Sequence, residues 1–100
     1  MAVVLSMRWA GVTPEQYDAV RDLVGWEENW ADGGVLHVAW FEEGALRVVD
    51  VWESQEDFER FSRERLEAGV TKAGLTGTPE VAFHPLHRRM VHPGATGGAS

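Results

Sequence analysis

Four short apolar runs alternate with two segments of helical spacing, and this order predicts a single α+β domain. The strand-like runs, rich in β-branched and aromatic residues, are residues 3–9, 35–41, 46–52 and 80–87. Glu43-Gly44 separates the two middle runs and predicts a tight hairpin, because Gly tolerates the positive φ that such turns require. Pro85 in the last run lacks a backbone donor, so we expect this strand at a sheet edge.

Both helical segments carry a start signal. Thr13 is followed by Pro14 and, three residues after the cap, by Gln16, a pattern typical of a capped first turn. Ser54 with Asp57 repeats the capping signal. Apolar residues at helical spacing then predict the buried faces, namely Tyr17, Val20, Leu23 and Val24 in the first helix and Phe58, Phe61 and Leu66 in the second. Glycines predict a flexible connector before the last strand: Gly69, Gly74 and Gly77.

A strand-helix-strand-strand-helix-strand order is typical of two split β-α-β units with right-handed crossovers. It predicts a ferredoxin-like, four-stranded antiparallel sheet with both helices on one face. The other face would then be a large apolar patch, which a second copy of the chain can bury. We expect this dimer interface to contain Leu36, Val38, Trp40, Val49 and Val51.

Length and composition limit the partners. One hundred residues make one domain, expected over residues 1–92, and the Gly/Ala/Ser-rich segment 93–100 is expected to be a disordered tail. A formal charge of -7 repels phosphate backbones and anionic lipids, so nucleic acid and membrane partners are not expected. The absence of a long apolar run or a leader-like start predicts a cytoplasmic protein. The absence of cysteine excludes disulfides and thiol chemistry.

At the level of motifs, the chain resembles the dimeric α+β barrel superfamily, of the antibiotic biosynthesis monooxygenase kind. The resemblance rests on residues 37–39, the Glu43-Gly44 turn, and residues 46–54 and 56–58. It implies a homodimer in which Trp52 lines a pocket between sheet and helices. The superfamily includes cofactor-free monooxygenases, haem-degrading enzymes, cyclases and proteins of unknown role, so it implies the fold more firmly than the function. Residues 54–66 contain no histidine to bind haem iron, and no cofactor is expected.

The hairpin register predicts a candidate catalytic pair. A two-residue turn at Glu43-Gly44 places His37 opposite Asp50, and Val35 opposite Trp52, on one face of the sheet. An Asp beside an imidazole fixes its tautomer and equips the pair for acid–base catalysis near neutral pH. The alternative is that the two side chains form a buried polar contact that only fixes the strand register.

We expect aromatic side chains to bind a substrate beside this pair. The expected substrate-binding residues are Trp52, Tyr17, Trp26, Phe41 and Phe61, although each tryptophan is also ordinary core filler. No metal site is expected, because the side chains of His84 and His87 would point to opposite faces of the sheet if both lie on one strand. Whether either histidine reaches the pocket stays open.

The resulting prediction is a small, cofactor-independent, monooxygenase-like enzyme of secondary metabolism. It would abstract a proton from a flat, largely apolar aromatic or polyketide-type substrate. A cyclase or isomerase could use the same His-Asp pair, and a non-catalytic dimeric binding or accessory protein is the alternative from another class. A cavity of roughly 300 Å³ or more beside His37 would favour a ligand, whereas a solid core would favour the accessory role.

Overall fold

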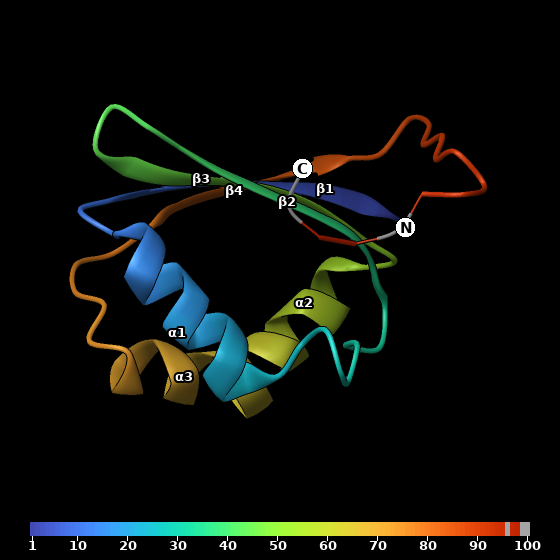
Figure 1. The fold of residues 1–100 in the computed structure, drawn as a ribbon. Helices are drawn as coiled ribbons and strands as arrows, with labels where there is room; N and C mark the ends of the chain where they lie inside the picture. Colours follow the sequence, from blue (N-terminus) through green and yellow to red (C-terminus); the bar gives the residue numbers. More distant parts are fainter. Residues whose placement is uncertain (96, 99–100) are drawn as a thin grey trace.

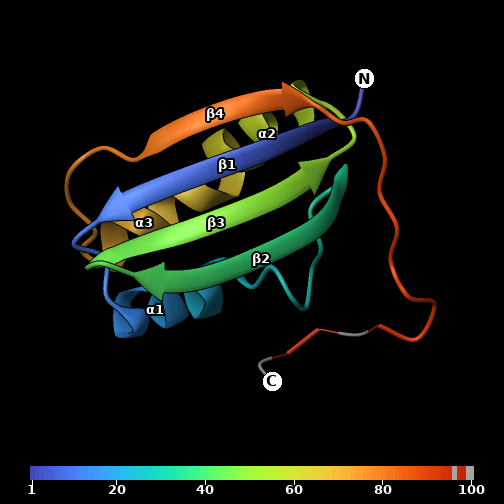
Figure 2. The same ribbon diagram turned by 90° about the horizontal axis from the view of Figure 1, so that it is seen from above.

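The computed structural model describes residues 1–95, 97 and 98, and its helices cover one face of a four-stranded antiparallel sheet (Figure 1). The elements are β1 (Val3–Ala10), α1 (Pro14–Val24), β2 (Gly34–Glu42), β3 (Ala45–Trp52), α2 (Gln55–Phe61), a π-helical segment η1 (Ser62–Leu66), α3 (Glu67–Lys72) and β4 (Glu80–Pro85). The strand order across the sheet is β2-β3-β1-β4 (Figure 2). The predicted ferredoxin-like fold is therefore confirmed.

Both predicted helix starts are confirmed by their hydrogen bonds. The Thr13 hydroxyl accepts a hydrogen bond from the Gln16 backbone N–H, and the Gln16 side chain accepts one from the Thr13 N–H. The Ser54 hydroxyl accepts from the Asp57 N–H at 3.1 Å. These bonds satisfy backbone donors that the first helical turns leave unpaired, so they fix where α1 and α2 begin.

The second helical region differs from the prediction at Gly69. This glycine lies inside α3, and a Cβ there would come within 2.6 Å of Val24 Cγ2 on α1. Gly69 therefore serves the close approach of two helices rather than a flexible connector. Leu23 was expected in the core but is 51% exposed, because α1 turns it away from the sheet.

The π-helical segment η1 changes the spacing of the helix residues that face the sheet. Phe58 and Phe61 of α2 point to the interior, and the next interior positions are Leu66 and Val70. The five-residue step from Phe61 to Leu66 spans η1, whereas an α-helix repeats every 3.6 residues. The wider turn thus keeps all four side chains on one face.

The hairpin between β2 and β3 confirms most of the predicted register. Glu43 and Gly44 have φ values of 51° and 71°, as a two-residue turn requires, and His37 lies opposite Asp50. The predicted pairing of Val35 with Trp52 is wrong. Gly34 is the residue opposite Trp52, because a β-bulge shifts the register between Gly34 and Leu36.

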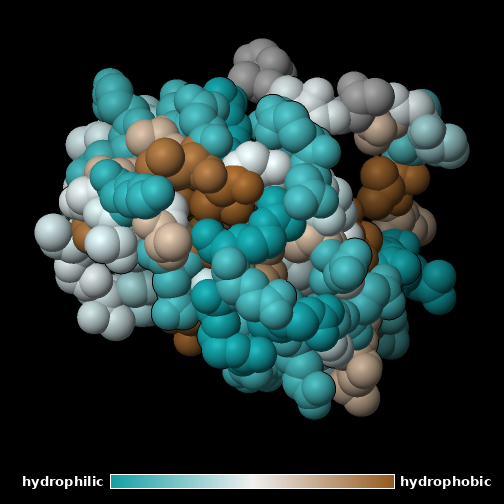
Figure 3. All heavy atoms as spheres, turned by 90° about the horizontal axis from the view of Figure 1, so that it is seen from below, coloured by the Kyte–Doolittle hydropathy of each residue, from teal (hydrophilic) through white to brown (hydrophobic). Residues whose placement is uncertain are grey.

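The two faces of the sheet differ in their packing. The inner face, under the helices, holds the core: Leu5, Trp9, Leu46, Val48 and Trp52, together with Val12. The outer face is bare of helices (Figure 2), and on it Val38 and Trp40 are 45% and 37% exposed. Seen from the opposite, helical side, the surface is mostly hydrophilic with some apolar patches (Figure 3). The expected dimer across the outer face stays a prediction.

Strand β4 and the segment that follows it form the C-terminal part of the domain. Strand β4, with Pro85 at its end, lies at one edge of the sheet as predicted. Beyond it, Arg89 forms an exposed ion pair of 2.8 Å with Glu53, the residue that follows β3. Within the predicted tail 93–100, residues 96, 99 and 100 lie outside the described residues. No helix in the part of the chain that the structure describes is long and apolar enough to cross a membrane.

Candidate functional site

A cavity of about 120 Å³ lies between the inner face of the sheet and the helices. Its wall is almost entirely apolar and contains seven aromatic rings besides that of His37: Trp9, Tyr17, Trp26, Trp30, Trp52, Phe58 and Phe61. Of the described lining side chains, Tyr17, His37 and Asp50 supply the polar groups other than tryptophan N–H. An apolar pocket with a few convergent polar groups is typical of a binding site.

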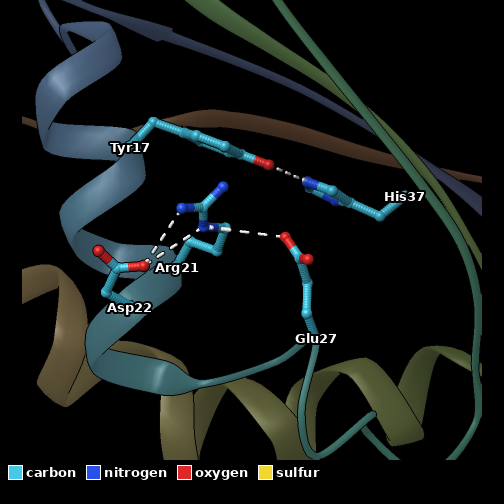
Figure 4. Close-up of polar contacts among 5 residues, drawn as sticks. All are labelled: Tyr17, Arg21, Asp22, Glu27 and His37. Atoms are coloured by element: carbon cyan, nitrogen blue, oxygen red, sulfur yellow. Dashed lines mark hydrogen bonds and ion pairs between the residues drawn. The ribbon is translucent and has the colours of Figure 1, made fainter. Parts of the chain in front are cut away.

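The polar side chains form one hydrogen-bonded chain. His37 Nδ1 lies 2.6 Å from Asp50 Oδ1, and Trp52 Nε1 donates to Asp50 Oδ2 at 3.1 Å. On its other side, His37 Nε2 lies 2.7 Å from the Tyr17 hydroxyl (Figure 4). This hydrogen-bonded series of side chains, called the polar chain below, connects α1, β2 and β3. It brings the predicted pair together with Trp52 and Tyr17.

Asp50 is the buried centre of this chain. It is 6% exposed and, among the described residues, is the one charged side chain that is buried. An isolated carboxylate at such a position would be costly, but both its oxygens accept N–H groups. Because a carboxylate only accepts, His37 presents N–H at Nδ1 and, when neutral, a lone pair at Nε2.

Tyr17 keeps its proton. Burial, followed by the negative charge of Asp50, raises the pKa of its phenol from 10.0 to about 12. Arg21 opposes this shift, while Asp18 and Glu27 add to it. At neutral pH the phenol therefore carries its proton, and it donates to Nε2 when His37 is neutral.

Two aromatic clusters surround the polar chain. The Trp26 ring lies 5.7 Å from Tyr17 and 5.5 Å from His37 between centroids, so it packs against their hydrogen bond. Trp52 packs 5.4 Å from Phe58 and 5.5 Å from Phe61. These contacts place the edges of several rings at the cavity, which suits a flat apolar guest.

The predicted substrate-binding residues divide into two groups. Tyr17, Trp26, Trp52 and Phe61 line the cavity. Phe41 is 38% exposed and does not line it, but its ring meets Tyr17 edge-on at 6.2 Å between centroids. Its observed contact therefore supports the Tyr17 ring from outside the cavity.

A charged cluster borders the polar chain on the solvent side. Arg21 pairs with Asp22 at 3.3 Å and with Glu27 at 3.8 Å, and Figure 4 shows these side chains beside the Tyr17–His37 bond. All three are at least partly exposed, so these pairs contribute little to stability. They instead make this rim of the site polar.

Several lining residues were missed by sequence reasoning. Leu5, Met7 and Trp9 alternate along β1 and line the cavity, a pattern that strand parity alone could have revealed. Trp30 lies in an irregular loop, where no periodicity applies, and donates its N–H to the Gly34 carbonyl at 2.6 Å. The bond between Tyr17 and His37 joins a helix to a strand, so neither element's spacing predicts it.

The C-terminal histidines lie away from the cavity. His84 pairs with Val4, and it therefore lies on the outer face of the sheet. His87 follows β4 and does not line the cavity either. Within residues 1–95, 97 and 98, no group of three or more His, Cys, Asp or Glu could hold a metal ion.

The strand order and the helix-covered sheet define a ferredoxin-like fold, and solved structures share this fold. No protein-family model and no curated protein sequence matches the chain. The fold is similar to that of a mutant of SnoaB, a cofactor-independent oxygenase from Streptomyces nogalater, with a TM-score of 0.66 and 14% identity over 91% of this chain and 98% of that one.

Two further structures show how widely this fold is used. The monooxygenase ActVA-Orf6 of Streptomyces coelicolor, solved with nanaomycin D, has a TM-score of 0.60 and 18% identity over 91% of this chain and 92% of that one. A protein of unknown function from Nitrosomonas europaea has a TM-score of 0.64 and 17% identity, covering 93% and 96% of the two chains. The predicted resemblance is therefore confirmed for the fold.

Proposed function

We propose that this chain is a small, cofactor-independent, monooxygenase-like enzyme of secondary metabolism that abstracts a proton from a flat, largely apolar aromatic or polyketide-type substrate. The observation that carries the proposal is the His37–Asp50 pair at the one polar corner of an aromatic cavity. A buried ionisable pair in an apolar cleft is costly for stability and typical of functional sites. The similarity to two oxygenases of the same fold supports it.

His37 would serve as the base and Asp50 as its positioning partner. Proton removal from a phenol or enol makes the substrate anion electron-rich enough to pass one electron to dioxygen. The substrate radical and superoxide then combine into a peroxide, and loss of water leaves a carbonyl oxygen on the ring. The apolar wall of the half-open cavity would keep water away from these intermediates once the substrate covers the rim. Trp52, Tyr17, Trp26 and Phe61 would hold the substrate rings.

A cyclase or isomerase would require the same proton abstraction without dioxygen. The second candidate from another class is a non-catalytic, small-molecule-binding or accessory protein. One observation favours it, because the cavity of about 120 Å³ is smaller than the roughly 300 Å³ at the lower end of ligand pockets. In the enzyme proposal, only part of a large substrate enters the cavity and the remainder lies toward the open rim.

Homodimerisation is part of the proposal. Val38 and Trp40 form an exposed apolar stripe on the outer face of the sheet, and Leu36, next to the β-bulge, extends it while also lining the cavity. If a second copy of the chain packed its own stripe against this one, both stripes would be buried. A two-fold interface uses the same surface of both subunits in this way. This arrangement leaves each cavity on the far side of its own sheet.

The test measures turnover and stability together. Wild type and His37→Gln are assayed for oxygen uptake and product formation against naphthols, dihydroxynaphthalenes and hydroxyanthrones, and both are melted thermally. Loss of the base should lower turnover by about 10²- to 10⁴-fold. Gln can still hydrogen-bond to Asp50, so the melting temperature should change little.

The matched control is His84→Gln, which makes the same substitution on the outer face of the same sheet. It should retain wild-type turnover. Proton exchange or ring closure without oxygen uptake would support the cyclase or isomerase. Tight binding without any turnover, equal in wild type and His37→Gln, would contradict an enzymatic role and favour the binding protein.

A further inference from the structure

The hydrogen bonds of His37 leave it no free acceptor for a substrate. A neutral imidazole has one N–H and one lone pair. The N–H at Nδ1 is directed to Asp50 at 2.6 Å, and Nε2 meets the Tyr17 hydroxyl at 2.7 Å. A substrate hydroxyl that approaches this corner therefore finds the base already occupied by the phenol.

The orientation of the two rings shows that this contact is a well-formed hydrogen bond. The planes of Tyr17 and His37 are inclined by 6°, with centroids 6.0 Å apart. Together with an O···N distance of 2.7 Å, this places the rings tip to tip, and the imidazole lone pair lies in its ring plane. Trp26 and Phe41 pack against the Tyr17 ring and hold it in this position.

We propose that Tyr17 is a catalytic proton relay that meets the substrate hydroxyl and passes its proton to His37. The inference rests on the proposed function and replaces its direct contact between His37 and substrate. The substrate is accordingly a phenol or enol whose hydroxyl enters the polar corner. An apolar cavity of about 150 Å³ can hold a benzene ring, so the smaller, half-open space of about 120 Å³ admits at most one hydroxylated ring, with the remainder of the substrate at the open rim.

The relay moves two protons in one direction. The substrate O–H bond breaks as its proton joins the Tyr17 oxygen, and the phenol's own proton moves to His37 Nε2. The products are a substrate anion, a neutral Tyr17 and an imidazolium that Asp50 stabilises. The raised pKa of Tyr17, about 12, agrees with a phenol that hands a proton on without resting as tyrosinate.

A chromogenic phenol tests the relay without knowledge of the natural substrate. Para-nitrophenol reports its ionisation by colour, and para-nitroanisole has nearly the same shape without an acidic proton. Both are titrated into wild type, Tyr17→Phe and His37→Gln below the pH at which the free phenol ionises. Wild type should bind the phenol in its ionised form.

The relay predicts that Tyr17→Phe lowers the bound phenolate fraction about tenfold or more, as His37→Gln does. The remaining ring still blocks the approach to Nε2, so the substrate oxygen cannot take the place of the hydroxyl. Para-nitroanisole should bind all three proteins equally, which shows that the cavity is intact. Because Tyr17 is the only tyrosine, the chain can also be labelled with fluorotyrosine. Its fluorine resonance should then shift with the phenol and not with the ether.

The possible failures are distinguishable. If Tyr17→Phe ionises the bound phenol as well as wild type does, while His37→Gln does not, the relay is overturned and direct catalysis by His37 stands. If wild type binds the phenol only in its neutral form, both the relay and the proposed function fail. A fluorine resonance that responds equally to phenol and ether also overturns the relay, including in the case where Tyr17→Phe does not fold.

Discussion

The two faces of the sheet come from the same strands but differ in chemistry. On β2, His37 and Ala39 point to the helices, while Leu36, Val38 and Trp40 point to the bare face. The inner face combines a closed core with one hydrogen-bonded polar chain. The outer face carries partly exposed apolar side chains, with Arg47 over the Trp40 ring. Because successive side chains of a strand point to opposite faces, adjacent residues of β2 belong to the candidate site and to the candidate interface.

Because of this difference, different groups lower the stability on the two faces. On the inner face, each polar group is costly unless it is paired, and Asp50 is paired with both His37 and Trp52. On the outer face, apolar side chains such as Val38 remain partly in water and gain stability only through association. In the proposed function, the inner face therefore governs folding and chemistry, and the outer face governs assembly.

The largest expected effect compares a truncation on each face. Leu5 is 1% exposed, so Leu5→Ala should lower the free energy of unfolding by about 3 kcal/mol through lost burial and a cavity. Val38→Ala, on the outer face, should lower it by about 1 kcal/mol or less. Urea denaturation of both variants measures the difference. Equal losses would mean that the two faces are equally buried in solution.

The next effect concerns the polar chain of the inner face. Tyr17, the single tyrosine, should titrate with a pKa of about 12 in place of its ordinary value of 10.0. Since folding raises this pKa, the stability it contributes is complete below about pH 10 and is lost as the pH rises toward 12. Phenolate absorbance, native against denatured, measures it.

Asp50→Asn provides the control for this titration. The charge of Asp50 is the second cause of the shift after burial, so the variant should show a lower Tyr17 pKa than wild type. Arg21, Asp18 and Glu27, the other charged groups near the phenol, are unchanged. Coincident native and denatured titrations in wild type would refute the burial of the Tyr17 phenol beside Asp50.

A smaller effect is expected from a charge on the outer face. Val38→Glu should raise the dissociation constant of the proposed dimer about tenfold or more, equivalent to about 1.4 kcal/mol, while the monomer stays folded. Thr71→Glu adds the same charge on exposed α3 and should leave assembly unchanged. Sedimentation equilibrium compares them. A monomeric wild type would remove the outer face from the assembly proposal.

The smallest expected effect leaves both faces untouched. Thr13→Ala removes the oxygen that caps α1 and should cost about 1 kcal/mol, whereas Thr13→Ser retains the cap and should cost less. Thermal unfolding gives the comparison. A destabilisation as large as that of Leu5→Ala would mean that the first turn of α1 carries more of the packing than its exposed residues indicate.

The fold was largely predictable because its signals are local. The caps at Thr13 and Ser54 and the turn at Glu43-Gly44 each depend on neighbouring residues, and the turn then dictates the pairing of His37 with Asp50. The bulge that displaces Val35 was not predictable, since alternating residues look the same with or without it.

The site was predictable only where it follows the sheet. Asp50 and Trp52 share a face by strand parity, and their hydrogen bond follows from that. The Tyr17–His37 bond depends on how α1 crosses the sheet, and the place of Gly69 in a helix contact depends on how two helices meet. Such distances arise from tertiary packing, which no local pattern encodes.

The widened π-helical turn at Ser62–Leu66 determines which helix side chains form the cavity wall opposite the sheet. A π-helical turn contains one more residue than an α-helical turn, so Phe61 before it and Leu66 after it both face the interior. Leu66 and Val70 therefore continue the cavity wall beyond this turn, whereas the His37–Asp50 pair stands on other elements, β2 and β3.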